Sequence, residues 1–362
     1  MEIGVFTFGD VSPDAGGLNP LRRLPELVEE IALADEVGLD VFGIGEHHRP
    51  DFAASAPAVV LAAAAARTTR IRLTSAVTVL SADDPVRVFE QFATLDLISR
   101  GRAEIMAGRG VLVEPFRLFG YDLADYESLF AEKVELLMKL RDHERVTWAG
   151  LHRPPLHDEA ILPRPAQKSL PIWVAVGGTP QSAVRAGSLG LPMTLSILGG
   201  ALRSAAPLAQ IHRQAASQAG HAPQPLALAQ HGFVAPTSQR ANDLYFPAEA
   251  EVLNRIGRER GLREMTRADF DGRAGLNGPL LIGSPAQVAE KILREHEIFG
   301  HQRLLIQLAI GSVPHHDVMR AIELLGGEVA PAVRAALASQ PRNSTKLVST
   351  FGGNPRASSA GR

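Results

Sequence analysis

The chain has 362 residues, a formal net charge of −2 at pH 7 and no cysteine. The missing cysteines exclude disulfides, a thiolate nucleophile, and zinc or iron–sulfur sites with sulfur ligands. The sequence has no cluster of Lys and Arg that could bind the phosphates of a nucleic acid. No apolar run approaches the roughly 20 residues of a membrane span, and the N-terminal residues lack a signal-peptide pattern. We therefore expect a soluble cytoplasmic protein that binds a small molecule.

Short apolar runs alternate along the chain with longer helical patterns, which indicates an α/β protein with parallel strands joined by crossover helices. Eight such runs are present, the number that closes a (β/α)8 TIM barrel. The predicted strands cover residues 3–8, 41–44, 72–78, 103–107, 172–176, 192–196, 227–234 and 303–308.

Two of the intervening helices have clear start signals. Asp84-Pro85 and Ser284-Pro285 each place an N-cap residue before a proline at the first helical position, and a glycine follows each helical pattern. A further helix, from Ala56 to Ala66, contains no charged or strongly polar side chain, although an outer barrel helix should have one polar face. We interpret this helix as the interface of a homodimer, with an overlying loop as the alternative.

Two stretches, residues 108–171 and 236–284, are longer than ordinary barrel connections. We interpret them as insertions after the fourth and seventh strands of one domain, residues 1–339. The last residues, 340–362, are rich in Ser, Arg, Gly, Asn and Pro, and we expect a disordered tail there.

Two features at predicted strand ends favour binding of one phosphate group. After the fifth strand, Gly177-Gly178-Thr179-Pro180-Gln181-Ser182 leads into a helix, so that backbone N–H groups and hydroxyls can meet an anion. After the fourth strand, Arg109 stands between Gly108 and Gly110, where a guanidinium can bind an anion bidentately. A purely structural glycine turn and a structural ion pair are the respective alternatives.

The second strand is followed by Glu46, His47 and His48. Because neighbouring strand residues point to opposite faces, we expect only one imidazole to face the barrel mouth. The other strand ends supply His231, near the end of the seventh strand, but no further set of metal ligands, so we predict no metal site. We interpret the inward histidine as a hydrogen-bond donor or general acid/base. A capping or core histidine is the alternative.

Several strings together resemble the bacterial luciferase-like, flavin-dependent monooxygenases. They begin with Gly45-Glu46-His47-His48 and Leu73-Thr74-Ser75-Ala76-Val77-Thr78-Val79-Leu80, and continue with Asp84-Pro85-Val86-Arg87, Leu97-Ile98-Ser99-Arg100-Gly101-Arg102, Gly108-Arg109-Gly110 and Phe116-Arg117-Leu118-Phe119-Gly120. The resemblance resumes around residues 171–196 and at Gly283-Ser284-Pro285, and it implies a (β/α)8 barrel with insertions.

The resemblance also implies roles for particular residues. Arg109, Gly178, Thr179 and Ser182 match positions that hold the flavin phosphate, within the segment that includes Gly177. Ser75-Ala76 matches a non-prolyl cis peptide against the flavin ring, and His47 matches a histidine that handles protons beside the ring.

The implied reaction is a monooxygenation with FMN, reduced by a separate NAD(P)H:flavin reductase, and O2. Gly108 departs from the cysteine of the luciferase catalytic subunit, and Leu112 from a tyrosine shortly after it, so light emission does not follow from the resemblance. The apolar Val111, Leu112 and Val113 favour a small, partly apolar substrate. Two alternatives remain, which are hydride transfer with a deazaflavin (F420) or NAD(P)H on the same barrel, and a flavin-binding protein without turnover.

Overall fold

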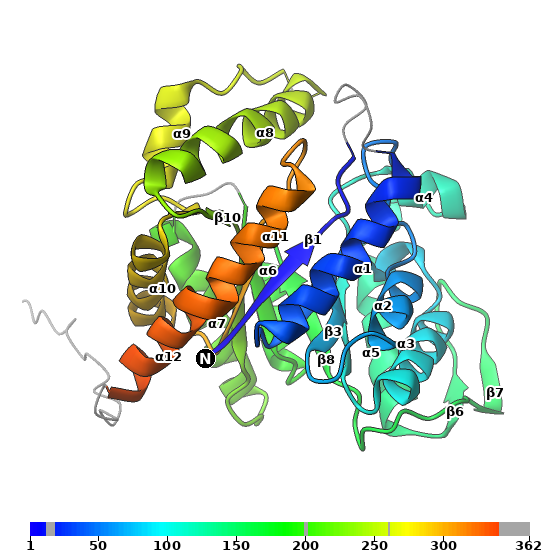
Figure 1. Cartoon of the computed structure of the whole chain (residues 1–362). Coiled ribbons are helices and arrows are strands. Elements are labelled where there is room, and N and C mark those ends of the chain that lie inside the picture. The colour runs from blue at the N-terminus through cyan, green and yellow to red at the C-terminus, as the bar shows by residue number, and fades with distance from the viewer. Residues whose placement is uncertain (12–18, 199–201, 260, 340–362) are drawn as a thin grey trace, which may run out of the picture.

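The computed structural model describes residues 1–11, 19–198, 202–259 and 261–339 of the chain. The predicted tail, residues 340–362, lies outside the described residues. Figure 1 shows a barrel of strands with helices around it, and the helices α8 and α9 lie at one end of the barrel.

The barrel is closed by eight parallel neighbours, as the alternating pattern predicts. β1 pairs with β2 and β12, and the circle closes between β9 and β10, where Leu226 stands opposite Met193. Apolar side chains such as Phe6, Met106 and Leu305 fill its interior. The strands of the circle are β1 (Glu2–Thr7), β2 (Val41–Ile44), β3 (Arg72–Ser75) with β4 (Thr78–Val79), β5 (Ala103–Gly108), β8 (Ile172–Val176), β9 (Met193–Ile197), β10 (Leu226–Val234) and β12 (Arg303–Gln307).

All eight predicted strands are therefore present, and the predicted (β/α)8 barrel is confirmed. The third is interrupted, because the chain leaves β3 after Ser75 and rejoins β5 only with β4. A short extra strand, β11 (Leu281–Gly283), pairs with the end of β10.

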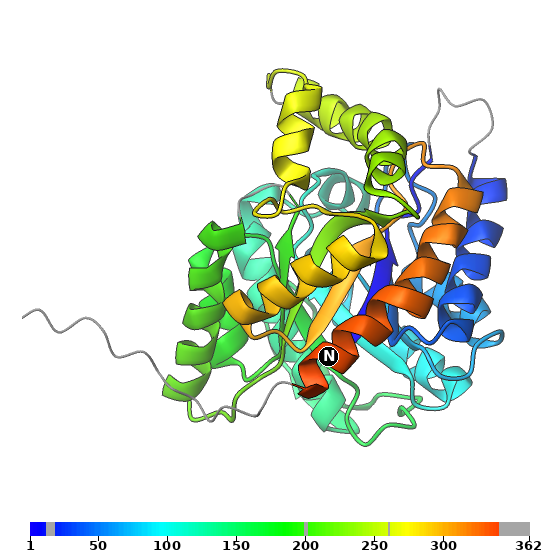
Figure 2. The ribbon, with the colours of Figure 1, turned by 60° about the vertical axis from the view of Figure 1, so that its left-hand side comes forward.

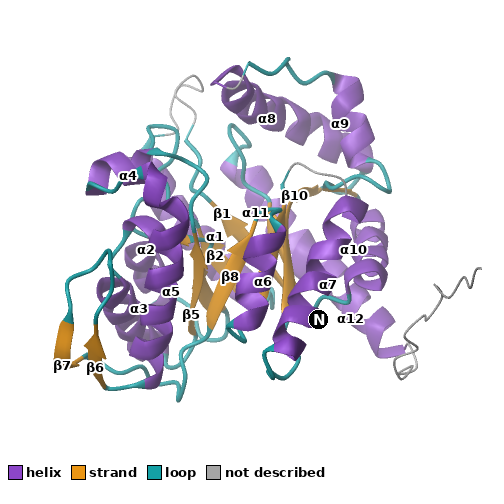
Figure 3. Cartoon of the chain, turned by 180° about the vertical axis from the view of Figure 1, so that it is seen from behind, coloured by secondary structure: helices purple, strands orange, loops and turns teal. Residues whose placement is uncertain are grey.

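Helices surround the barrel on its outside (Figure 3). The two start signals are confirmed: the Asp84 side chain accepts a hydrogen bond from Val86 N at 2.8 Å, and Ser284 forms a capping box with Gln287. The helices are α1 (Pro20–Glu36), α2 (Pro57–Ala65), α3 (Pro85–Ser99), α5 (Tyr126–Asp142), α6 (Pro180–Ser188), α7 (Leu202–Gln218), α10 (Pro285–Phe299), α11 (His315–Leu324) and α12 (Ala330–Ser339), the last two joined by a π-helical turn, Leu325–Val329.

The first insertion follows β5 and contains more regular structure than its polar sequence indicates. It holds α4 (Glu114–Phe119), ahead of α5, and an antiparallel hairpin of β6 (Arg145–Trp148) and β7 (Leu156–Ala160). The hairpin lies at the edge of the molecule, away from α8 and α9 (Figure 1).

The second insertion forms a helical layer across one end of the barrel. It consists of α8 (Ser238–Glu259) and α9 (Arg267–Ala274), which lie above the strand ends in Figure 2. The buried Tyr245 of α8 donates a hydrogen bond to the carbonyl of Gln307 at the end of β12 (3.1 Å), so this layer is fastened to the barrel. Within the described residues, no helix is long and apolar enough to cross a membrane.

Candidate functional site

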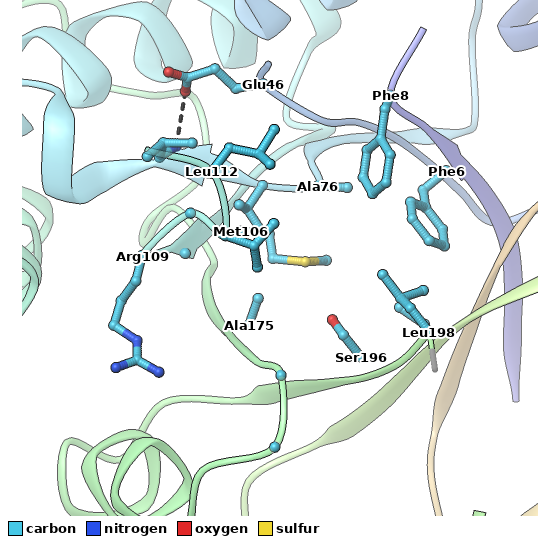
Figure 4. A pocket seen from close by; sticks show the side chains of 18 of the residues that line it. Phe6, Phe8, Glu46, Ala76, Met106, Arg109, Leu112, Ala175, Ser196 and Leu198 are labelled. Carbon is cyan, nitrogen blue, oxygen red and sulfur yellow. Dashed lines mark hydrogen bonds between the residues drawn. The ribbon is translucent and has the colours of Figure 1, made fainter. Parts of the chain in front are cut away.

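A cavity of about 530 Å³ opens at the carboxyl ends of the barrel strands. Figure 4 shows Arg109 at one end of it and Phe6, Phe8 and Leu198 at the other. Of the described lining residues, most are apolar, and the acidic and basic ones are Glu46 and Arg109 together with two histidines. The cavity therefore has a cationic end and an apolar end.

Most of the predicted site residues meet at this cavity. Those that line it are His47, Ala76, Gly108, Arg109, Gly177 and Gly178. Thr179 and Ser182 lie at its cationic end through their bonds to each other and to Arg109, whereas Ser75 lies behind its wall.

The cationic end has the features of an anion site. Arg109 Nη2 donates to Thr179 Oγ1 at 3.3 Å, and Thr179 Oγ1 lies 2.7 Å from Ser182 Oγ. Thr179 is the N-cap residue of α6, but its side chain accepts no capping hydrogen bond. At Gly177 and Gly178 an added Cβ would meet nothing within 4 Å, so the backbone there is open to a ligand.

Helix α5 completes this end with two residues that the sequence does not reveal. The Tyr126 hydroxyl donates to the carbonyl of Gly110 at 2.6 Å, and its ring centroid lies 5.0 Å from Cζ of Arg109. The neighbouring Glu127 forms ion pairs with Arg109 and with Arg185 of α6. These contacts come from an insertion and a crossover helix, which have no motif that marks them.

His47 stands between two aromatic rings in the cavity wall. Its ring stacks on Phe52, with centroids 4.3 Å apart, and meets Phe8 edge to face at 4.6 Å. Burial lowers the pKa of His47 to about 4, and the nearby Asp51 only partly opposes this effect. The imidazole is therefore neutral at pH 7, with one donor and one acceptor nitrogen.

The expectation that only one of the two adjacent histidines faces the cavity is wrong, because both line it. The alternation of a strand does not apply, since β2 ends at Ile44 and the following residues form an irregular loop. Glu46, buried beside them, holds this loop: one oxygen accepts from Val79 N at 2.8 Å and the other lies 2.9 Å from His48 Nε2.

The cis peptide also differs by one residue from its expected position. It joins Ala76 and Val77, not Ser75 and Ala76. The Ser75 hydroxyl donates to the carbonyl of Met106 and accepts from its N–H, both at 3.0 Å, so the side chain of Ser75 binds β5 just beyond Thr74, the last residue of β3 that pairs with that strand. Ala76, which begins the cis peptide, lines the cavity.

His231, at the mouth of the barrel, belongs to a separate buried cluster under α8. Its Nδ1 lies 3.6 Å from Oε1 of Glu249, which accepts from Arg273 at 2.8 Å. Arg273 also donates to the carbonyl of Leu198, a cavity residue, at 3.2 Å. This cluster fastens the second insertion over the cavity. Within the parts of the chain that the structure describes, no three His, Asp or Glu side chains form a group that could hold a metal ion.

Comparisons with known proteins show the family and the fold of this chain. Residues 1–302 match the model of the luciferase-like monooxygenase family. The structure of monooxygenase RslO1 from Streptomyces bottropensis is similar, with a TM-score of 0.81 and 27% identity over 91% of this chain and 99% of that chain.

Two further relatives differ in their cofactors. The oxygenating constituent of 3,6-diketocamphane monooxygenase from Pseudomonas putida, solved with FMN, shares the fold, with a TM-score of 0.74 and 21% identity over 91% of this chain and 98% of that one. An F420-dependent glucose-6-phosphate dehydrogenase of Kineococcus radiotolerans is 34% identical over 161 residues, which are 42% of this chain and 47% of that protein.

Proposed function

Because the chain belongs to the luciferase-like monooxygenase family, we propose that it is an FMN-dependent monooxygenase. It uses reduced FMN and O2 to oxygenate a small, largely apolar substrate. The observation that carries the proposal is the polarity of one cavity, which joins an anion-binding end at Arg109 to an apolar end at Phe6 and Phe8, with the neutral His47 in its wall.

The residues at the cationic end fit the phosphate of a flavin mononucleotide. Arg109 would bind it through its guanidinium, Thr179 and Ser182 through their hydroxyls, and the open backbone at Gly177 and Gly178 lets the group approach. When bound, FMN supplies the redox chemistry, because it carries the electrons that activate O2. Ala76 and Gly108 line the cavity between β3 and β5 and would contact the rest of the cofactor.

His47 manages protons in this proposal. Since its pKa is about 4, the ring is not a cation at pH 7 and can accept a proton at one nitrogen while it donates a hydrogen bond from the other. The stacking on Phe52 and the edge contact with Phe8 fix the ring plane. Asp51 stabilises the protonated form, and it is itself bound to Arg49 (3.1 Å).

The apolar end of the cavity disfavours substrates that carry a charged group there. Phe6, Phe8, Leu198, Leu208 and Leu305 line it, so a charged group placed there would lose its hydration without a partner. The same side chains keep water out of the cavity. An oxygenation needs a site without water, because water promotes side reactions of reactive intermediates. We therefore expect a neutral substrate, bound by burial of its hydrocarbon surface.

Hydride transfer with F420 is the second candidate, because a relative that is 34% identical over 161 residues depends on that cofactor. Binding to the purified protein discriminates the two. We expect reduced FMN to bind more tightly than F420, followed by O2 consumption on addition of a substrate. Tight binding of F420, with no measurable binding of oxidised or reduced FMN, would overturn the proposal.

A separate NAD(P)H:flavin reductase and a second copy of this chain are the partners that we propose. The outer face of α2 exposes Val59 (69%), and the neighbouring α3 exposes Leu97 and Ile98 to about half (46% and 48%). The inner face of α2 packs Leu61 into the core. Exposed apolar side chains on these two helices, which pack against each other, favour a homodimer through α2.

A further inference from the structure

Two arginines from different elements converge on one carboxylate at the cationic end of the cavity. Arg109 follows β5 and binds one oxygen of Glu127, while Arg185 of α6 binds the other oxygen at 2.9 Å. Glu127 stands in the first turn of α5. The carboxylate thus bridges two guanidinium groups that the sequence separates by 76 positions, beside the hydroxyl of Thr179.

The positions of both guanidinium groups are fixed by aromatic rings as well as by this carboxylate. Cζ of Arg109 lies 5.0 Å from the ring centroid of Tyr126, and Cζ of Arg185 lies 5.6 Å from that of Phe130. Cation–π contacts of this kind attract a guanidinium to the ring independently of its anionic partner. The pair is therefore preorganised for an anion.

One carboxylate leaves this pair of arginines incompletely neutralised. Nη1 of Arg185 is buried and has no hydrogen-bond partner among the described residues. Burial also lowers the pKa of Arg185, as expected for a cation with insufficient compensation. A buried donor without a partner is unfavourable. A phosphate monoester carries about −1.5 to −2 charges and three acceptor oxygens, so it suits the two arginines better than a carboxylate does.

We propose that Glu127 occupies the phosphate position in the unliganded protein, and that the cofactor phosphate displaces it and binds Arg185 as the second arginine of the site. This inference rests on the proposed function. The Glu127 side chain is 58% exposed, so it can leave the arginines for water with little loss. Glu127 is then an internal competitor that weakens cofactor binding, as suits a reduced flavin that arrives from another protein and departs after use.

Competition predicts a specific pattern of affinities for the full-length protein. Glu127→Gln should raise the affinity for FMN and for inorganic phosphate by about three- to tenfold, the range expected for loss of weak, partly exposed ion pairs. The affinity for riboflavin, which has no phosphate, should stay unchanged. Arg185→Met should weaken FMN at least about tenfold, also without effect on riboflavin. Isothermal titration calorimetry with FMN, riboflavin and phosphate measures all of these.

Two variants control for charge alone. Glu135→Gln removes the same charge from an exposed position of the same helix and should leave each affinity within about twofold of the wild type. Glu127→Asp keeps the charge but shortens the reach, so displacement predicts an FMN affinity between those of the wild type and Glu127→Gln. An unchanged affinity for Glu127→Asp would mean that only the distant field of the charge matters, which would overturn the proposal.

The proposal fails if FMN and phosphate bind Glu127→Gln no more tightly than the wild type, with a correct fold shown by circular dichroism. Glu127→Ala repeats the test should Glu127→Gln not fold. Failure of the proposed function is distinguishable. In that case the wild type binds no flavin mononucleotide, while the phosphate titrations still decide whether Glu127 competes for the arginines.

Discussion

Gly108 and Val77 face each other in the wall of the cavity, so closely that a Cβ added at Gly108 would lie 2.5 Å from Cγ2 of Val77 and 3.0 Å from its Cβ. Val77 follows the cis peptide, and Gly108 ends β5 immediately before Arg109. The branched side chain of Val77 fills the space that a side chain at position 108 needs. A thiol at this position, as in the luciferase catalytic subunit that the sequence resembles, has no room here.

We expect Gly108→Ala to lower the free energy of unfolding by about 1–3 kcal/mol, because Val77 is β-branched and cannot rotate away from the added methyl group. Urea unfolding measures the change. Val77→Ala in the same chain should restore part of the loss, because it removes the two γ-methyl groups of Val77 but keeps its Cβ, which lies 3.0 Å from the added methyl group. Gly272→Ala is the matched control, since an added Cβ there meets nothing within 4 Å. Equal stability of Gly108→Ala and the wild type would show that Val77 can move aside and that this contact does not limit the side chain at position 108.

Arg109→Ala should weaken FMN binding by about 1.5–3 kcal/mol, the contribution of a hydrogen bond to a charged group. The loss should concern the phosphate alone, so riboflavin should bind both proteins equally. Flavin fluorescence titration provides the affinities, and Arg117→Ala, at an exposed arginine of α4, is the control. If FMN binds Arg109→Ala as it binds the wild type, Arg109 does not hold the phosphate.

His47→Gln should retain FMN affinity and lose most turnover, because the ring lines the cavity without belonging to its cationic end. General acid–base contributions are typically about 10²- to 10⁴-fold in rate. Stopped-flow oxidation of the reduced flavin and product analysis separate binding from chemistry. His157→Gln, at an exposed position of β7, should behave as the wild type. Turnover of His47→Gln within about threefold of the wild type would remove His47 from the mechanism.

The pKa of His47 also predicts a pH dependence of stability. Burial lowers this pKa from 6.5 to about 4, so between these values the unfolded chain binds the proton and the folded chain does not. Protonation therefore favours unfolding as the pH falls from 6.5 to 4. Relative to His47→Gln, the wild type should lose up to about 3 kcal/mol over this range. Urea unfolding of both proteins at several pH values provides the difference, and parallel pH profiles would contradict a buried, neutral His47.

A charge on the outer face of α2 tests the proposed homodimer. Val59 is 69% exposed, and Val59→Asp should convert a dimer into a monomer because a carboxylate would be buried at the interface without a partner. Sedimentation velocity at micromolar concentration reports the mass of both proteins. Leu151→Asp, which alters a residue that is 84% exposed outside α2, should leave the mass unchanged. A monomeric wild type would exclude the interface altogether.

Local sequence patterns predict the barrel well, since each of its signals depends on residues close together in the chain. The cap at Asp84 and the capping box at Ser284 require only the next few residues, and both form as expected. The irregular loop after Ile44 is the exception. A strand pattern cannot show where the strand stops, so the expectation that only one of His47 and His48 faces the cavity is wrong.

The fold class and most of the cavity-lining candidates follow from the sequence alone, because strand periodicity and the glycines at strand ends are local properties. Arg109, Gly177 and Gly178 can be named from the sequence, as they follow predicted strands directly. Tertiary packing alone brings Glu127 and Arg185 to Arg109, and Val77 against Gly108. These contacts depend on closure of the barrel and on where an insertion packs, which no short segment specifies.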